Sequence, residues 1–139
     1  RCAAAEMHSG FATLRNICTM NVGLRVRLHT QPPALVADIR RIDELWNEGL
    51  SRFGGPFLAG PEFTVVDAFY CPVAYRVRTY GIALTGSAQQ YAQRLLDLPA
   101  MSEWEQAARA ETWRELDHEA EALQVGVVTA DYRAPAAAP

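Results

Sequence analysis

The sequence predicts an all-α domain, a bundle of about five helices. Three observations lead to this prediction: apolar residues recur at three- and four-residue steps, glycine and proline separate the apolar stretches, and no stretch alternates convincingly between apolar and polar residues. With 139 residues, 50% of them hydrophobic and 21% charged, the chain has enough apolar side chains for one core. We expect the helical domain to span residues 1–128 and an alanine- and proline-rich tail to span 129–139.

Each expected helix has an apolar stripe and a start or stop signal. Paired prolines at 32–33 begin the second helix, Gly54-Gly55 ends it, and Pro99 closes the fourth. Capping boxes that begin at Ser87 and Ser102 are expected to open the last two helices. The expected ranges are 1–27, 33–53, 65–80, 88–98 and 103 onward, where the last helix or a successor continues to about 123.

Gly10 lies inside the first expected helix, where a glycine costs about 1 kcal/mol relative to alanine. Two contributions could offset this cost. The glycine either allows close packing of the helix or makes room for a ligand.

A helix-capping signal precedes the third expected helix. Thr64 is expected as the N-cap, and Asp67, three residues further on, is placed to accept a hydrogen bond from the Thr64 amide. Phe63 and Ala68 stand at the two ends of a hydrophobic staple. We therefore expect Thr64 and Asp67 to have a structural role.

The charge of the chain argues against two classes of partner. The formal net charge is -3 and the pI is near 5.6, so the attraction to phosphate that nucleic-acid and membrane-surface proteins normally have is missing. No apolar run approaches the roughly 20 residues that span a bilayer. We expect no nucleic acid and no membrane as partners.

The reactive residue types set further limits. All 13 basic residues are arginine, which excludes chemistry that needs a lysine amine. The 3 cysteines form no CxxC pair, and their odd number predicts reduced thiols and a cytoplasmic location. His29, His118 and the cysteines share no ligand spacing, so we expect no metal site.

Three segments, taken in chain order, match a known pattern. Glu6-Met7-His8-Ser9-Gly10-Phe11 comes first, Phe57-Leu58-Ala59-Gly60 with Phe63-Thr64-Val65-Val66-Asp67-Ala68 and Pro72 comes second, and Trp104 after Pro99 comes third. Together they resemble the C-terminal domain of bacterial-type glutathione transferases. In that family the threonine and aspartate of the second segment cap the central helix of the domain.

The resemblance implies an enzyme that uses glutathione as its co-substrate and needs no metal. In the family, a thioredoxin-like N-terminal domain binds glutathione and activates its thiol, and the thiolate attacks a small electrophilic substrate. We expect that domain to be absent from this chain, so the chain alone is expected to be inactive. The C-terminal domain would wall the electrophile pocket, and its first two helices would contribute to a homodimer.

The first helix lines the ligand cleft in this family, which suggests roles for its polar residues. We expect His8 to face glutathione, with the small Ser9 beside it leaving room for a ligand. Arg15, seven residues further on, would lie on nearly the same helix face and attract a carboxylate of glutathione or of the substrate. The plainer interpretations are a partly exposed histidine and an ordinary surface arginine.

Three apolar or aromatic residues are candidates for the wall of the electrophile pocket. They are Met7 and Phe11 in the first helix and Tyr70 in the third. Residues at such helical spacing are more often part of the core. We keep both interpretations.

A second hypothesis of a different class is a non-catalytic, stand-alone protein–protein interaction module. Helical domains of this family also serve as docking domains in assemblies. A thioredoxin-like segment encoded upstream of Arg1 would favour the enzyme, whereas a methionine close before Arg1 would favour the module.

Overall fold

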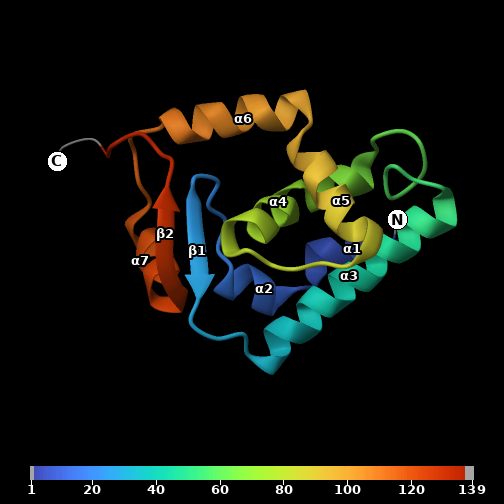
Figure 1. The fold of residues 1–139 in the computed structure, drawn as a ribbon, viewed down its shortest axis with the longest axis horizontal. Coiled ribbons are helices and arrows are strands. Elements are labelled where there is room, and N and C mark those ends of the chain that lie inside the picture. The colour runs from blue at the N-terminus through green and yellow to red at the C-terminus, as the bar shows by residue number, and fades with distance from the viewer. Residues whose placement is uncertain (1, 137–139) are drawn as a thin grey trace.

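The computed structural model describes residues 2–136, and within that range seven helices and two short strands follow one another (Figure 1). The all-α class is confirmed, since helices dominate and the strands form one small sheet. The elements are α1 (Cys2–Ser9), α2 (Ala12–Ile17), β1 (Leu24–Leu28), α3 (Pro33–Phe53), α4 (Val65–Tyr80), α5 (Gly86–Leu96), α6 (Pro99–Ala110), α7 (Leu116–Val125) and β2 (Gly126–Asp131).

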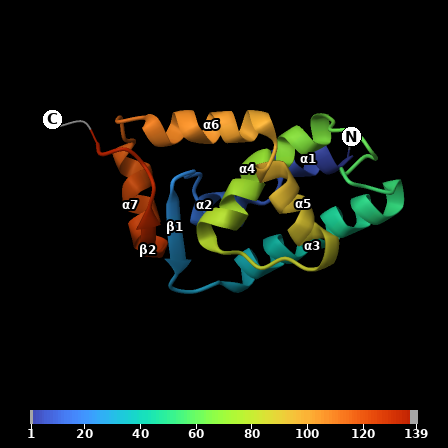
Figure 2. The same ribbon diagram turned by 45° about the horizontal axis from the view of Figure 1, so that its top comes forward.

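Helix α4 lies in the middle of the bundle. Figures 1 and 2 show α1, α3 and α5 around it, α6 along one side, and α7 with the two strands at the end away from the N-terminus. Trp46 of α3 is fully buried and meets the rings of Tyr70 and Tyr91 edge-on, with centroids 5.5 and 4.9 Å away. This aromatic cluster joins α3, α4 and α5 into one core.

The start of α4 is fixed by a buried carboxylate. Asp67 accepts hydrogen bonds from the Thr64 amide (2.8 Å) and from the Thr64 hydroxyl (2.9 Å). With Thr64 as the N-cap and Asp67 three residues further on, the two residues form a capping box. Its other oxygen accepts from the Leu58 amide (3.0 Å) and from the Tyr91 hydroxyl (2.9 Å). Burial raises the pKa of Tyr91 far above its usual value, and the charge of Asp67 raises it further, so the phenol keeps the proton that it donates.

The first expected helix is divided in two, so the prediction of a continuous helix over 1–27 was wrong. Helix α1 ends where the Gly10 amide donates to the Glu6 carbonyl at 2.7 Å. Phe11 then adopts a left-handed backbone conformation (φ 53°), and Asp38 of α3 accepts from the Leu14 amide at 2.9 Å in the first turn of α2. A Cβ on Gly10 would lie 2.6 Å from the Glu6 carbonyl oxygen, so close packing explains this glycine.

The two strands also correct the sequence analysis, which found no strand. Strands β1 and β2 pair antiparallel, with a register shift between Arg25 and Val26. In β1, Leu24 and Val26 are buried and alternate with arginines, which is the pattern of a half-buried strand. No local signal predicts this strand's partner, because β2 lies about a hundred residues further along the chain.

Two more boundaries differ from expectation. Helix α5 begins after Thr85, whose amide and hydroxyl both donate to Asp43 of α3, and Ser87 lies inside the helix. Helix α6 begins at Pro99, three residues before Ser102, so neither serine opens a capping box. Strand β2 includes residues 129–131 of the expected tail, and the last three residues of that tail lie outside the described residues.

Candidate functional site

His8 is on the last turn of α1 and is exposed. Its ring meets the edge of the Phe69 ring of α4, with the centroids 6.5 Å apart. Phe69 itself keeps 38% of its surface exposed. The imidazole therefore lies on a surface that α1 and α4 share, next to an aromatic side chain that is open to a ligand or to another domain.

Ser9 is also exposed, directly before the break between α1 and α2. Its hydroxyl donates to the Ala5 carbonyl at 2.9 Å. The proton of Ser9 is thus used within its own helix, and its oxygen remains available as an acceptor.

The three candidates for the pocket wall lie inside the domain. Met7 and Phe11 are 7% and 6% exposed, and Tyr70 is fully buried with its hydroxyl donating to the Ala3 carbonyl at 3.0 Å. Burial raises the pKa of Tyr70 well above its usual value, so this phenol is a neutral donor. These side chains belong to the buried core and offer almost no surface of their own to a ligand.

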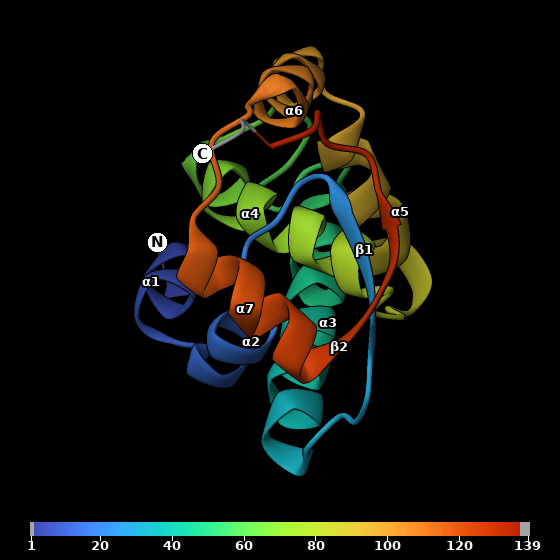
Figure 3. The ribbon, with the colours of Figure 1, turned by 90° about the vertical axis from the view of Figure 1, so that its left-hand side faces the viewer.

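Arg15 lies on α2 and not on the helix that carries His8. Because α1 and α2 are separate helices, the argument that placed His8 and Arg15 on one continuous helix face does not hold. Arg15 lines a hollow of about 320 Å³ together with Arg76 of α4 and with His118 and Glu121 of α7. Figure 3 looks onto the end of the molecule where α7 lies beside α2.

Sequence reasoning missed Phe69, which lies beside His8, and Arg76, which lines the hollow with Arg15. A signal for them exists, because Phe69, Pro72 and Arg76 follow one another at three- and four-residue steps on a single helix. This stripe lies beside the buried stripe of Val73 and Val77. His118 has no such signal, because its place near Arg76 depends on the packing of α7.

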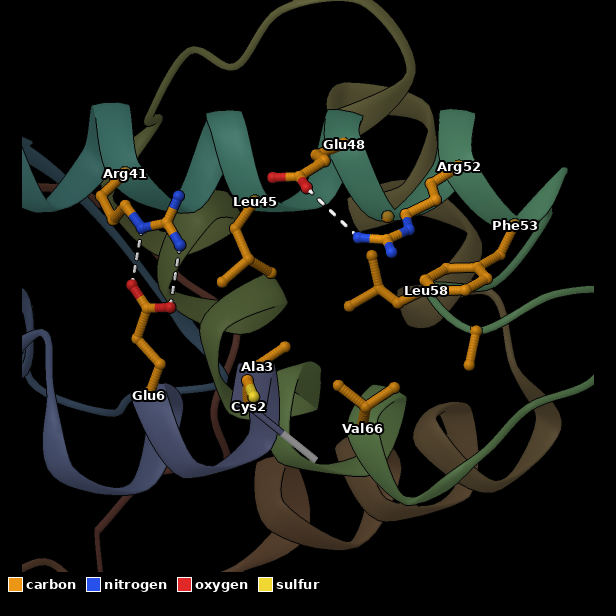
Figure 4. Close-up of a pocket in the computed structure, with 12 residues that line it drawn as sticks. Cys2, Ala3, Glu6, Arg41, Leu45, Glu48, Arg52, Phe53, Leu58 and Val66 are labelled. Carbon is orange, nitrogen blue, oxygen red and sulfur yellow. Dashed lines mark hydrogen bonds and ion pairs between the residues drawn. The ribbon is translucent and has the colours of Figure 1, made fainter.

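A second cleft, of about 410 Å³, separates α1 from α3. Figure 4 shows Glu6 and Arg41 pointing toward each other across it, with two hydrogen bonds of 2.6 and 2.9 Å. Arg41 lowers the pKa of Glu6 through these bonds. Leu45 of α3 and Val66 of α4 line the cleft, so it combines an apolar floor with a charged rim.

The cysteines and histidines form no metal site in the described range. Among residues 2–136, no three histidine, cysteine, aspartate or glutamate side chains lie together in a way that would hold an ion. Burial raises the pKa of the Cys18 thiol to about 12 and that of Cys71 to about 11, so both remain protonated at neutral pH. No nucleophilic thiolate is available from these two residues.

Comparison with known proteins identifies the family. A model of the glutathione S-transferase C-terminal domain matches residues 31–115, and the chain belongs to this family. No curated protein and no solved structure matches the chain. The matched range contains α3, α4, α5 and α6, whereas His8, Ser9 and Arg15 precede it.

Among residues 2–136, no helix is both long enough and apolar enough to cross a bilayer.

Proposed function

We propose that the protein containing this chain is a glutathione transferase that conjugates glutathione to small electrophiles. This domain then forms a wall of the electrophile pocket, beside a thioredoxin-like domain that holds glutathione and activates its thiol. The observation that carries the proposal is the family membership over residues 31–115. The family supports glutathione as the co-substrate. The thiolate of glutathione is the reactive species, and it attacks the electrophile to form the conjugate.

Within this proposal His8 faces glutathione. Its exposed ring beside Phe69 supports this role, because a ligand held over α1 and α4 would meet an imidazole donor and an aromatic face together. Ser9 offers an acceptor oxygen next to it. Met7, Phe11 and Tyr70 keep the proposed role of a pocket wall only as part of the buried core of the domain that forms it.

The proposal is tested with the protein that carries this chain together with its thioredoxin-like domain. Conjugation of glutathione to 1-chloro-2,4-dinitrobenzene is followed by absorbance, and His8→Ala is expected to lower kcat/KM for glutathione roughly three- to tenfold, as the loss of one hydrogen bond does. His29→Ala is the matched control, because His29 is exposed on the segment after β1. Unchanged kinetics in His8→Ala would remove this residue from the site.

The same protein decides between the enzyme and the interaction module. Turnover and retention on immobilised glutathione support the transferase. Absence of both would contradict it and favour a docking domain.

Two further parts of the proposal concern assembly and location. We propose a homodimer that uses the surface of α1 and α3, where the cleft of Figure 4 opens. Light scattering is expected to give twice the mass of one chain, and a monomer would contradict this. A cytoplasmic location is proposed because the three cysteines are free thiols.

A further inference from the structure

The hollow between α2, α4 and α7 has more positive than negative charge. Its charged residues are Arg15, Arg76 and Glu121, with His118 beside them. Two guanidinium groups and one carboxylate leave one net positive charge before His118 is counted. The hollow measures about 320 Å³, which is enough for a small organic ligand.

Arg76 is held in place by the backbone around it. Its Nε donates to the Cys18 carbonyl at 2.8 Å, and its Nη1 donates to the Pro72 carbonyl at 3.3 Å. Burial lowers the pKa of Arg76, and the positive charge of Arg15 lowers it further, but an arginine remains charged at neutral pH. The guanidinium is therefore a fixed cation in a partly buried position.

Neither arginine has a carboxylate partner among the described residues. The Nε of Arg15 is buried and has no acceptor within residues 2–136. The nearby carboxylate of Glu121 is engaged by the Nδ1 of His118 at 2.8 Å. A positive charge without a partner is costly in a partly buried position, so these two guanidinium groups favour a ligand that brings its own anionic oxygen.

We propose that Arg15 and Arg76 bind the carboxylate of a small monoanionic acceptor substrate in this hollow. The Cys18 and Pro72 carbonyls already accept from Nε and Nη1 of Arg76, which leaves its Nη2, together with the Nη atoms of Arg15, to donate to the oxygens of a carboxylate. One negative charge balances the hollow. The identification of this ligand as the acceptor substrate rests on the proposed transferase function. The anion site itself does not, because it is defined by this chain alone.

The site is tested first by binding to this chain. Calorimetric titration with 4-nitrobenzoate is compared with titration by 4-nitrobenzamide, which has nearly the same shape but no charge. We expect the carboxylate to bind about tenfold tighter than the amide, the size of one charge-assisted contact. Equal affinities for the two compounds would overturn the proposal.

Variants then locate the binding. Arg15→Gln is expected to remove the preference for the carboxylate, and Arg76→Lys, which keeps the charge but loses the backbone hydrogen bonds that hold the guanidinium in place, is expected to reduce it. Arg27→Gln is the matched control, because Arg27 is exposed on β1, outside the hollow. Circular dichroism and Tm verify that each variant is folded, and a preference that survives in Arg15→Gln would also overturn the proposal.

An activity measurement separates this inference from the proposed function. The complete protein is given 4-chloro-3,5-dinitrobenzoate or its neutral amide, and in both the glutathione thiolate forms a bond to the ring carbon while chloride leaves. A higher kcat/KM for the benzoate, lost in Arg15→Gln and kept in Arg27→Gln, supports the acceptor role. If both compounds are turned over equally well, the hollow does not bind the acceptor substrate, but the transferase function stands. If neither compound is turned over, the transferase function is refuted, and the binding titration alone decides whether the hollow is an anion site.

Discussion

Asp67 joins three parts of the fold through one buried carboxylate. The loop at Leu58, the N-cap at Thr64 and the hydroxyl of Tyr91 on α5 all donate to it. Removing a shared acceptor lowers stability more than removing one donor, because each buried donor left behind has neither its protein partner nor water to bond with. The capping box is therefore a connection between elements as well as a helix start.

We predict that Thr64→Ala lowers the free energy of unfolding by about 1 kcal/mol, the usual cost of an N-cap. Asp67→Ala is expected to cost roughly 3 kcal/mol or more, since it leaves several buried donors unpaired. Urea unfolding measures both. Thr30→Ala is the control, because Thr30 is exposed before α3 and should change stability by less than about 0.5 kcal/mol. Equal losses in Thr64→Ala and Thr30→Ala would contradict the cap.

Glu6 gives a pH dependence of known sign. Hydrogen bonds from Arg41 lower its pKa in the folded protein, so the pair stabilises the fold above the unfolded value of about 4.3, and this stability is lost as the pH falls through the folded pKa. The side chains of Arg41 and Glu6 are 44% and 33% exposed, so solvent screening limits the effect to about 0.5–1 kcal/mol.

The measurement compares the wild type with Glu6→Gln by urea unfolding from about pH 7 to about pH 3. The stability difference is expected to narrow as the pH falls. Glu103→Gln is the control, because Glu103 is exposed and forms no ion pair among the described residues. A difference that stays constant over this range would show that Glu6 acts through packing and not through its charge.

At the scale of elements, the break between α1 and α2 depends on residues that are close in space. Glycine at position 10 lets the chain pass the Glu6 carbonyl, and Asp38 of α3 then caps the next helix through the Leu14 amide. The left-handed backbone of Phe11 costs energy, which burial of its ring offsets. The turn places His8 and Arg15 on different helices.

Gly10→Ala is predicted to destabilise the fold by more than about 1 kcal/mol, because the added Cβ meets a backbone oxygen that has little freedom to move. Gly54→Ala is a useful comparison. A Cβ there has no atom within 4 Å, and its cost comes only from the positive φ. Thermal unfolding of the two variants should rank Gly10→Ala as the less stable, and the reverse order would assign the break to another cause.

The elements that the sequence could predict are those whose ends are set by nearby residues. Helices α3 and α4 begin and end near their expected residues because proline, glycine and the Thr64–Asp67 pair act within a few positions. The break at Gly10 and the pairing of β1 depend on Asp38 and on β2, which are distant in sequence. For the site, the sequence pointed to His8 and Arg15, but the meeting of Arg15 with Arg76 required the packing of α2, α4 and α7.

At the scale of the whole molecule, the last described part of the chain packs against β1, α6 and α7 and joins them. Strand β2 pairs with β1, and the guanidinium groups of Arg25 and Arg109 each lie 5.1 Å from the centroid of the Tyr132 ring. Arg133 forms ion pairs with Glu119 and Asp131. These contacts connect β1 with α6 and α7, which are far from β1 in sequence. Residues 126–133 therefore hold the end of the bundle that contains the hollow of Arg15 and Arg76.

Deleting residues 126–139 is predicted to lower Tm and to loosen this end selectively. Amides of β1 should lose their protection from hydrogen exchange, since their pairing partners are gone, while amides of α3 and α4 stay protected by the aromatic core. Val127→Thr is the control, because Val127 is partly exposed and a threonine suits a strand. Uniform loss of protection in α3, α4 and β1 would mean that the strand pair and the helical core unfold as one unit, and unchanged exchange in β1 would mean that β2 contributes nothing to its stability.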